Sequence, residues 1–275
     1  EGSANLAMAL AFSTFLNCEN KLKDDSCGVC ASCSKMKKMV HPDVHFVYPM
    51  PSLGTGDKDK LRNENLAKFR EFILDNPYGD LIDWAHFVKA ENKQLNISVE
   101  ESRKIIGNIS MKAFEGEFKI VFIWKPEQMN VASANAILKA LEEPPEKTMF
   151  FLVTGDLEKN IQTIRSRTQA VIIPNFSEEE IEATLTAKFM VEPFKAKKAS
   201  NLAEGNLNHA LKLSQEIKDD SFPMFQDWLR ACYKLDFTSL ISFADDFQKL
   251  PKASQKQFFQ FGMSVVRSVL LIHSG

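Results

Sequence analysis

The sequence predicts an α/β domain built on a parallel sheet, followed by helical sequence. Two short apolar runs, 120–124 and 149–154, are rich in β-branched and aromatic residues, which is typical of buried parallel strands. Between the runs, apolar residues recur at the spacing of one helix face: Ala134, Ile137, Leu138 and Leu141. Strand, crossover helix and strand form a βαβ unit, in which the loops at the strand ends are available for a site.

Length and composition argue against several other classes of protein. A chain of 275 residues that is 44% hydrophobic can bury a large core, and its length indicates about two domains. The net charge of −2 gives no whole-chain argument for binding nucleic acid. No apolar run approaches the ~20 residues that span a bilayer, and no signal peptide is visible, so we expect a cytoplasmic protein without membrane contact.

Four of the five cysteines lie close together, and their spacing is C-x₈-C-x₂-C-x₂-C: Cys18, Cys27, Cys30 and Cys33. Four thiolates at such spacing can close tetrahedrally on Zn²⁺ and leave no open position for water, so the predicted site is structural. Disulfides are the alternative, and an intracellular location argues against them.

The first third of the chain is expected to hold a helix, a strand and an insertion. Leu6, Leu10 and Phe15 indicate the core face of an opening helix, and 44–48 reads as a strand. Residues 49–97 are the least readable part: their polar beginning predicts an exposed loop, and residues 90–96 are polar again. Within them, aromatic and aliphatic residues indicate helical packing: Phe69, Phe72, Ile73, Trp84 and Phe87. We interpret 49–97 as an ordinary insertion, and the alternative is a partner surface.

The later helices carry local start and stop signals. A helix is predicted over 98–114, with Ser98 and Glu101 at capping-box spacing and with isoleucines on its apolar face. Pro144 and Pro145 end the crossover helix. Ser177 and Glu180 form a second capping box, which begins a helix that runs to about residue 189.

Beyond residue 222, apolar side chains recur in three helical stripes. Their members are Phe225, Trp228, Leu229 and Cys232; Leu240, Phe243, Ala244 and Phe247; and Phe259, Met263, Val266 and Leu270. We interpret them as packing faces and not as a surface that stacks on bases, because basic residues do not interleave them regularly.

Three motifs together resemble the AAA+ clamp-loader subunits of bacterial DNA polymerase III. They are ANAILKALEEPP, a strand that ends in TGD, and TIRSRT, and the His41-Pro42-Asp43 motif and the cysteine module fit the same family. The resemblance runs from residue 1 to about 213 and is weaker in 49–97. It implies an AAA+ α/β domain over 1–174 with a zinc module at 18–33, a helical lid over 175–216 and the start of a helical collar over 217–275. It also leads us to expect further chain at both ends.

The chain departs from this family wherever ATP would be bound or hydrolysed. In a P-loop, backbone amides, a lysine and a hydroxyl residue hold phosphates and Mg²⁺. On that template Gly2 is the fourth position, whereas Ala4, Asn5 and Leu6 replace the glycine, the lysine and the hydroxyl residue. Without the family, residues 1–5 would read as a helix cap.

The acidic and cationic positions are replaced as well. Trp124 and Lys125 stand where the family has its Walker B Asp-Glu pair, and Asn208 stands at the sensor arginine. We interpret the nearby Glu127 as a solvated loop charge. The resemblance therefore implies that no ATP or Mg²⁺ is used in cis.

The Ser166-Arg167-Thr168 motif retains its arginine. In clamp loaders this motif supplies an arginine finger to a neighbour's ATP, and the resemblance assigns that role to Arg167. Arg165 is the competing candidate. Thr154 matches the family's sensor-1 position, and we expect it to cap the strand end.

These features are most similar to the delta-prime type of clamp-loader subunit. That resemblance implies a non-hydrolysing subunit that works with gamma/tau and delta subunits, and that meets the sliding clamp and primer-template DNA through the assembled complex. The main alternative is an active gamma-type AAA+ ATPase, in which a displaced acid such as Glu127 would take over. A zinc module that binds nucleic acid directly is a third interpretation, which the near-neutral charge and the closed cysteine site disfavour.

Overall fold

The computed structural model describes residues 2–52, 57–216 and 221–250, together with residues 255, 258–259, 262–263, 265–266 and 269–270. The chain divides into two compact units, Glu1–Asn175 and Phe176–Gly275. No helix among these residues is both long and apolar enough to cross a membrane.

The first unit is built on a three-stranded parallel sheet in the order β1-β4-β5. Its strands are β1 (Val44–Val47), β4 (Lys119–Trp124) and β5 (Thr148–Val153), so the predicted strands are confirmed. The central strand β4 is buried along its whole length, as expected of a parallel strand that is covered on both faces. Its side chains alternate, with Phe122 and Trp124 packed on one side and Val121 and Ile123 on the other.

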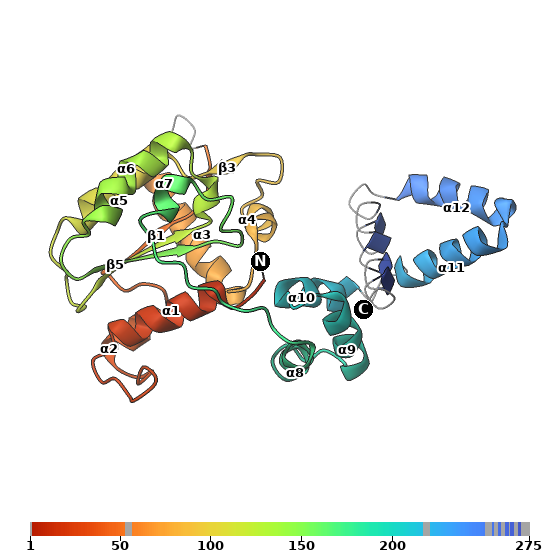
Figure 1. Cartoon of the computed structure of the whole chain (residues 1–275), viewed down its shortest axis with the longest axis horizontal. Helices are drawn as coiled ribbons and strands as arrows, with labels where there is room; N and C mark the ends of the chain where they lie inside the picture. Colours follow the sequence, from red (N-terminus) through yellow and green to blue (C-terminus); the bar gives the residue numbers. More distant parts are fainter. Residues whose placement is uncertain are drawn as a thin grey trace. The chain divides into compact units, whose positions relative to one another are not determined.

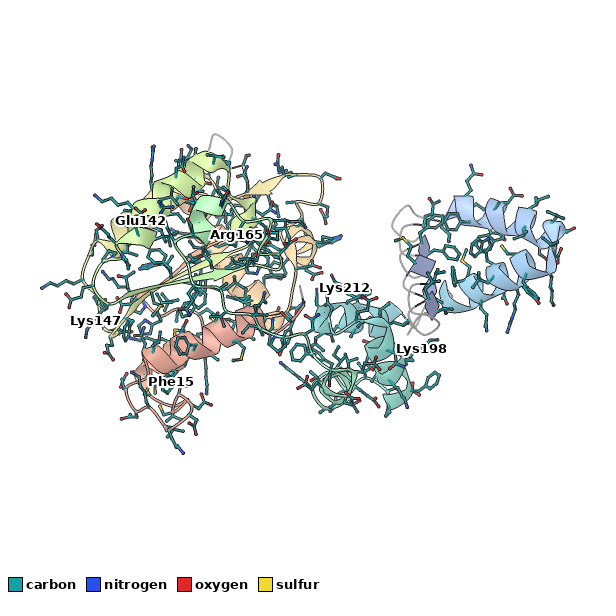
Figure 2. All side chains as sticks on the ribbon, viewed as in Figure 1. Phe15, Glu142, Lys147, Arg165, Lys198 and Lys212 are labelled. Atoms are coloured by element: carbon teal, nitrogen blue, oxygen red, sulfur yellow. The ribbon has the colours of Figure 1, made fainter. Side chains whose placement is uncertain are left out.

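Helices cover both faces of this sheet (Figure 1). One face packs against α1 (Asn5–Leu16), α2 (Ala31–Lys37), α3 (Lys58–Asp75) and α4 (Leu81–Phe87). The other face packs against α5 (Val99–Ile109), α6 (Val131–Glu142) and α7 (Gln162–Arg165). A short 3-10 turn, η1 (Pro126–Gln128), connects β4 to α6. On α1, Leu6 and Leu10 are buried as predicted, whereas Phe15 is half-buried (Figure 2).

The insertion contributes to the core of the first unit. Helix α3 begins at Lys58, so the prediction of an exposed loop is wrong for residues 58–65, while residues 53–56 lie outside the described part. Phe69, Phe72 and Trp84 are each at most 3% exposed, and they form one aromatic cluster with Tyr48 and Trp124. Two short strands, β2 (Met50–Pro51) and β3 (Leu95–Asn96), pair antiparallel and close the base of the insertion.

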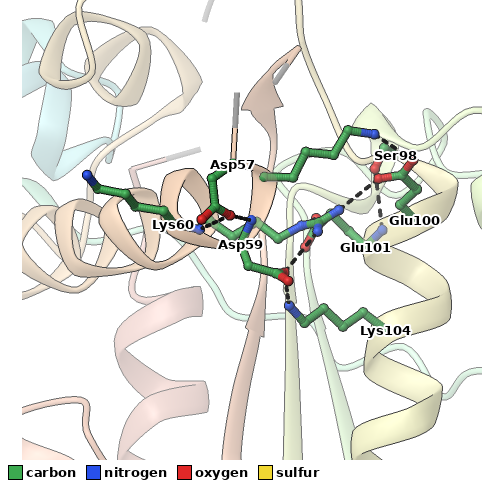
Figure 3. Close-up of polar contacts among 9 residues, drawn as sticks. Asp57, Asp59, Lys60, Ser98, Glu100, Glu101 and Lys104 are labelled. Carbon is green, nitrogen blue, oxygen red and sulfur yellow. Dashed lines mark hydrogen bonds and ion pairs between the residues drawn. The ribbon is translucent and has the colours of Figure 1, made fainter. Parts of the chain in front are cut away.

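A polar network fastens the first turns of α3 to α5 (Figure 3). Arg62 donates from Nε to Glu101 at 2.5 Å and from Nη2 to Glu100 at 2.8 Å. Lys104 donates to Asp59 at 2.9 Å. Ser98 caps α5 by accepting the N–H of Glu101, but the reciprocal half of the predicted capping box is not formed, because the Glu101 carboxylate is engaged by Arg62.

Helix α5 ends at Ile109, five residues before the predicted end, since the following loop is held by Asp43. The Asp43 carboxylate accepts the backbone N–H groups of Phe114, Glu115 and Gly116 at 2.5, 2.9 and 2.7 Å. These amides cannot also bond within a helix, so the buried carboxylate determines the path of the chain into β4.

The second unit is helical throughout its described part. Helices α8 (Glu178–Phe189), α9 (Pro193–Leu202) and α10 (Leu207–Glu216) pack on one another, and α8 begins with the predicted capping box of Ser177 and Glu180.

Helices α11 (Ser221–Lys234) and α12 (Phe237–Lys249) also pack together. Phe225 contacts Trp228, and Trp228 contacts Phe243, so packing is confirmed for the aromatic residues of the first two stripes. The third stripe is mostly exposed: Phe259 is 59% and Met263 is 73% exposed.

Candidate functional site

The carboxyl ends of β4 and β5 lie side by side, because Trp124 pairs with Val153 in the parallel register. The next residue of β4, Lys125, has a left-handed backbone with φ 58°. Its N–H still donates to the Val153 carbonyl at 2.9 Å, after which η1 turns the chain. This reversal determines where the side chains after β4 lie.

Trp124 is part of the core. Its side chain is 3% exposed, and its ring lies 5.5 Å from Phe69 and 5.9 Å from Phe72, centre to centre. An indole in an aromatic cluster offers no oxygen ligand to a cation. The insertion therefore packs on the residue that the sequence resemblance aligned with a Walker B acid.

Lys125 and Glu127 form a buried ion pair. Their side chains are 6% and 7% exposed, and Lys125 Nζ lies 3.8 Å from Glu127 Oε1. Thr154 Oγ1 donates to Glu127 Oε2 at 2.9 Å. The prediction that Glu127 is a solvated loop charge is wrong, because the left-handed Lys125 and the 3-10 turn bring the carboxylate back onto the end of β5.

Thr154 connects this pair to the start of α1. Its hydroxyl accepts the Asp156 N–H at 3.1 Å, which confirms the expected cap of the strand end. Asn5 Nδ2 donates to the Thr154 carbonyl at 2.9 Å, and Asn5 Oδ1 accepts the Leu6 N–H at 2.8 Å. Ala4, the N-cap of α1, makes no side-chain capping bond, so Asn5 holds the helix start against the sheet. Asn208, in the second unit, is 3% exposed on α10.

Arg167 follows α7 and is bound by groups from two helices. Its Nε donates to Glu142 Oε1 at 2.6 Å, and Nη2 lies 2.5 Å from the same oxygen. On the other side, Nη1 donates to the Thr163 carbonyl at 2.9 Å and to Ser166 Oγ at 3.3 Å. The Arg167 side chain is 29% exposed. The guanidinium is thus oriented and still reachable from solvent.

Arg165 has a different environment. It forms two parallel bonds of 2.7 Å to Glu158, whose side chain is 77% exposed. Arg165 also lines an open pocket of about 590 Å³ together with Asn160 and Ser166. Figure 2 labels Arg165 and Glu142, which belong to these two separate ion pairs.

The four clustered cysteines converge. Their sulfur atoms all lie within 4.8 Å of one another, and none of the chain's five cysteines is in a disulfide. Cys18 follows α1 and Cys33 lies on α2, so the module joins the two helices. Such a donor set, four sulfurs at one point, fits a tetrahedral metal ion.

Backbone N–H groups point at these sulfurs. Those of Val29 and Cys30 donate to Cys27 Sγ, and they lower the pKa of the Cys27 thiol to about 6. Burial raises the pKa of Cys33 to about 12. A metal ion would have to displace the Cys33 proton, as metal binding to thiols requires.

Two contacts of the site have no signal in the sequence. Glu142 lies within the ANAILKALEEPP motif, and the sequence does not indicate that it contacts Arg167, which lies 25 positions later. Likewise, the contact between Glu127 and Thr154 depends on the backbone conformation of Lys125, which no pattern reports.

Comparison with known families identifies the first unit. The family model described as "DNA polymerase III, delta subunit" matches residues 1–177, which is more than half of the chain. This chain belongs to that DNA polymerase III family. The expected resemblance to subunits of bacterial DNA polymerase III is thereby confirmed.

The relatives of this polymerase III family protein include delta-prime subunits. The delta' subunit of Yersinia pestis is 29% identical over 166 residues, covering 60% of this chain and 37% of that protein. The delta' subunit of Escherichia coli (strain K12) is 25% identical over 214 residues, covering 78% of this chain and 52% of that protein. The tau subunit of the same E. coli strain is 27% identical over 220 residues, covering 78% of this chain and 27% of that protein. The chain thus spans about half or less of the length of these relatives.

Proposed function

We propose that this chain is a delta-prime-type scaffold subunit of the polymerase III clamp loader, which does not hydrolyse ATP itself. In this proposal it assembles with gamma/tau and delta subunits into the complex that places the sliding clamp on primed DNA. The observation that carries the proposal is the end of β4, where a buried indole and a lysine paired with its own Glu127 occupy the positions of the acidic pair.

This strand end is poorly suited to Mg²⁺. Magnesium in nucleotide sites is held by carboxylate and hydroxyl oxygens together with the phosphates. Trp124 supplies no oxygen, and the Glu127 carboxylate faces the Lys125 ammonium and the Thr154 hydroxyl. Asn5, in place of the phosphate-binding lysine, carries no charge and is bonded to the Thr154 carbonyl.

Arg167 is the residue that we propose acts in trans, on the ATP of a neighbouring subunit. A guanidinium can stabilise the charge that develops on the γ-phosphoryl oxygens, and such fingers contribute about 10³–10⁵ in rate in well-studied NTPases. In support, Arg167 is held by three groups and remains 29% exposed.

The cysteine module is proposed to hold one structural zinc ion. Cys18, Cys27, Cys30 and Cys33 would be its four ligands. With four sulfur ligands a zinc ion has no open position, so it would stabilise the fold and take no part in a reaction.

One observation favours the second candidate, a gamma-type ATPase. Glu127 accepts from the hydroxyl of Thr154, which places a carboxylate beside the sensor-1 position. ATP hydrolysis by the isolated, intact protein, abolished by Glu127→Gln, would support this candidate and overturn the scaffold proposal.

The deciding experiment replaces Arg167 in a reconstituted clamp loader. The intact subunit would carry Arg167→Ala or, for comparison, Arg165→Ala, and assembly would be verified by gel filtration. We expect Arg167→Ala to lower the DNA-stimulated ATPase rate by about tenfold or more, whereas Arg165→Ala leaves it near wild type. If Arg167→Ala has no effect in an intact complex, the proposed role of this residue is wrong.

A further inference from the structure

The ion pair between Glu142 and Arg167 suggests a role for Glu142 in the proposed function. Glu142 is the last residue of α6, and a single one of its oxygens, Oε1, contacts both Nε and Nη2 of Arg167. We propose that Glu142 is a positioning residue, which orients the Arg167 guanidinium toward the triphosphate of a neighbouring subunit. This inference rests on the proposed function of Arg167.

Glu142 lies at the C-terminal end of α6, where a nearby cation is electrostatically favourable. The C-terminus of a helix carries a partial negative charge, so a carboxylate there is unfavourable unless a cation lies close to it. Glu143 follows directly, and it adds a second negative charge at the same helix end. Arg167 brings the compensating charge, and its position is thereby tied to α6.

The contacts fix the plane of the guanidinium. Glu142 holds the Nε and Nη2 edge, while the Thr163 carbonyl and Ser166 Oγ hold Nη1 from the α7 side. Because both edges are held, the Arg167 guanidinium has little freedom to rotate. A preorganised cation of this kind loses less entropy when it meets a phosphate.

The same pair is a weak source of stability. Glu142 is 48% and Arg167 is 29% exposed, and ion pairs as open to solvent as this contribute little to folding. A positioning role and a structural role therefore predict different results. Loss of the Glu142 charge should slow the reaction at the neighbouring site and leave folding and assembly unchanged.

The chain offers a matched control at the next position. Glu143 lies at the same helix end and is exposed, and its carboxylate forms no ion pair among the residues that the structure describes. Glu142→Gln and Glu143→Gln remove one negative charge each at neighbouring positions. Only the first of them removes a partner of Arg167.

The test measures DNA-stimulated ATPase in clamp loaders reconstituted with the full-length subunit. Four variants are compared: Glu142→Gln, Glu143→Gln, Arg167→Ala and the double variant Glu142→Gln/Arg167→Ala. We expect Glu142→Gln to lower kcat on the order of tenfold with an unchanged KM for ATP, and Glu143→Gln to match wild type. In the Arg167→Ala background, Glu142→Gln should cause no further loss, because Glu142 acts through Arg167.

Other outcomes separate the two proposals. If Arg167→Ala is slow but Glu142→Gln matches wild type, the positioning role is wrong and the role of Arg167 stands. If Glu142→Gln causes the same loss with and without Arg167, Glu142 acts independently, and the inference is likewise overturned. If Arg167→Ala itself has no effect, the proposed role of Arg167 fails and the inference fails with it.

Discussion

Lys125 shows how the conformation of one residue changes what a strand end can do. Its left-handed φ of 58° is uncommon for a residue with a side chain, and it turns η1 so that Glu127 faces back toward Thr154. The result is an internal ion pair at the end of β4. Because a buried carboxylate needs a compensating cation, Lys125 provides within the chain what a bound metal ion provides elsewhere.

Replacing this lysine should be costly to folding. In Lys125→Met the Glu127 carboxylate would remain buried without its cation, and breaking a buried pair in this way destabilises a protein by about 3–5 kcal/mol. We expect urea denaturation at pH 7 to show a loss of this size. The double variant Lys125→Met/Glu127→Gln should recover most of it, since no charge is then left uncompensated. A single variant within about 0.5 kcal/mol of wild type would show that the pair is not a stabilising contact.

The sequence shows which residues follow β4 and α7, but it does not show how their side chains are placed. The sequence contains Trp124 and Lys125 where the family resemblance leads us to expect an acidic pair, and it contains Arg167 at the proposed finger position. The sign of φ at Lys125 is not visible in the sequence, because no local sequence pattern reports the backbone conformation of a single lysine. For this reason the prediction of a solvated Glu127 is wrong.

Among the elements, those with local signals were predicted well. Strands β4 and β5, helix α6 with its proline stop, and helix α8 with its capping box each depend on residues within a few positions of one another. The sequence does not predict the start of helix α3, because the first two turns of this helix are polar. Those turns are held by contacts to α5, about 40 positions away, and a sequence pattern does not report such contacts.

The loop between α5 and β4 depends on Asp43, and its stability should depend on pH. Burial alone would raise the pKa of Asp43, but the backbone N–H donors of residues 114–116 outweigh it and hold the pKa below the usual carboxyl value. The pKa is depressed in the folded state, so the stabilisation is present above the ordinary carboxyl pKa. It is lost as the pH falls through the lower, folded-state value.

Asp43→Asn tests this contribution. An amide has one acceptor oxygen and loses the charge, so we expect a loss of about 2–3 kcal/mol at pH 7. The difference between variant and wild type should shrink as the pH falls below the ordinary carboxyl pKa. Urea denaturation at several pH values measures both effects, with Asp24→Asn as the control, because Asp24 is exposed and lies between Cys18 and Cys27. An Asp43→Asn penalty that stays constant as the pH falls below the ordinary carboxyl pKa would contradict the assigned role of the charge.

For the whole molecule, the family match and the fold agree on the first unit. The match covers residues 1–177, and the first compact unit covers Glu1–Asn175. Within that unit, α1 is tied to the sheet at both ends. Asn5 bonds to the end of β5, and Asn17 exchanges two hydrogen bonds with the backbone of Phe118, at 2.8 and 2.9 Å. The cysteine module follows directly after the second of these ties.

This arrangement predicts a local effect of metal removal. If the module holds zinc, the purified protein should contain one zinc ion per chain, and a strong chelator should release it. Because α1 keeps both of its ties to the sheet, only the segment from Cys18 through α2 should lose order, and β4 and α6 should stay folded.

Metal analysis and hydrogen–deuterium exchange measure these effects together. Exchange should rise in residues 18–37 after chelation and stay unchanged in α6. Cys30→Ser should reproduce the effect, whereas Cys232→Ser, which alters the one cysteine outside the cluster, should keep the zinc. A protein that contains no metal, or one whose whole first unit unfolds on chelation, would contradict this description. If the whole first unit unfolds on chelation, zinc stabilises the sheet as well as the cysteine module, and the two ties of α1 to the sheet are too weak to keep the sheet folded without it.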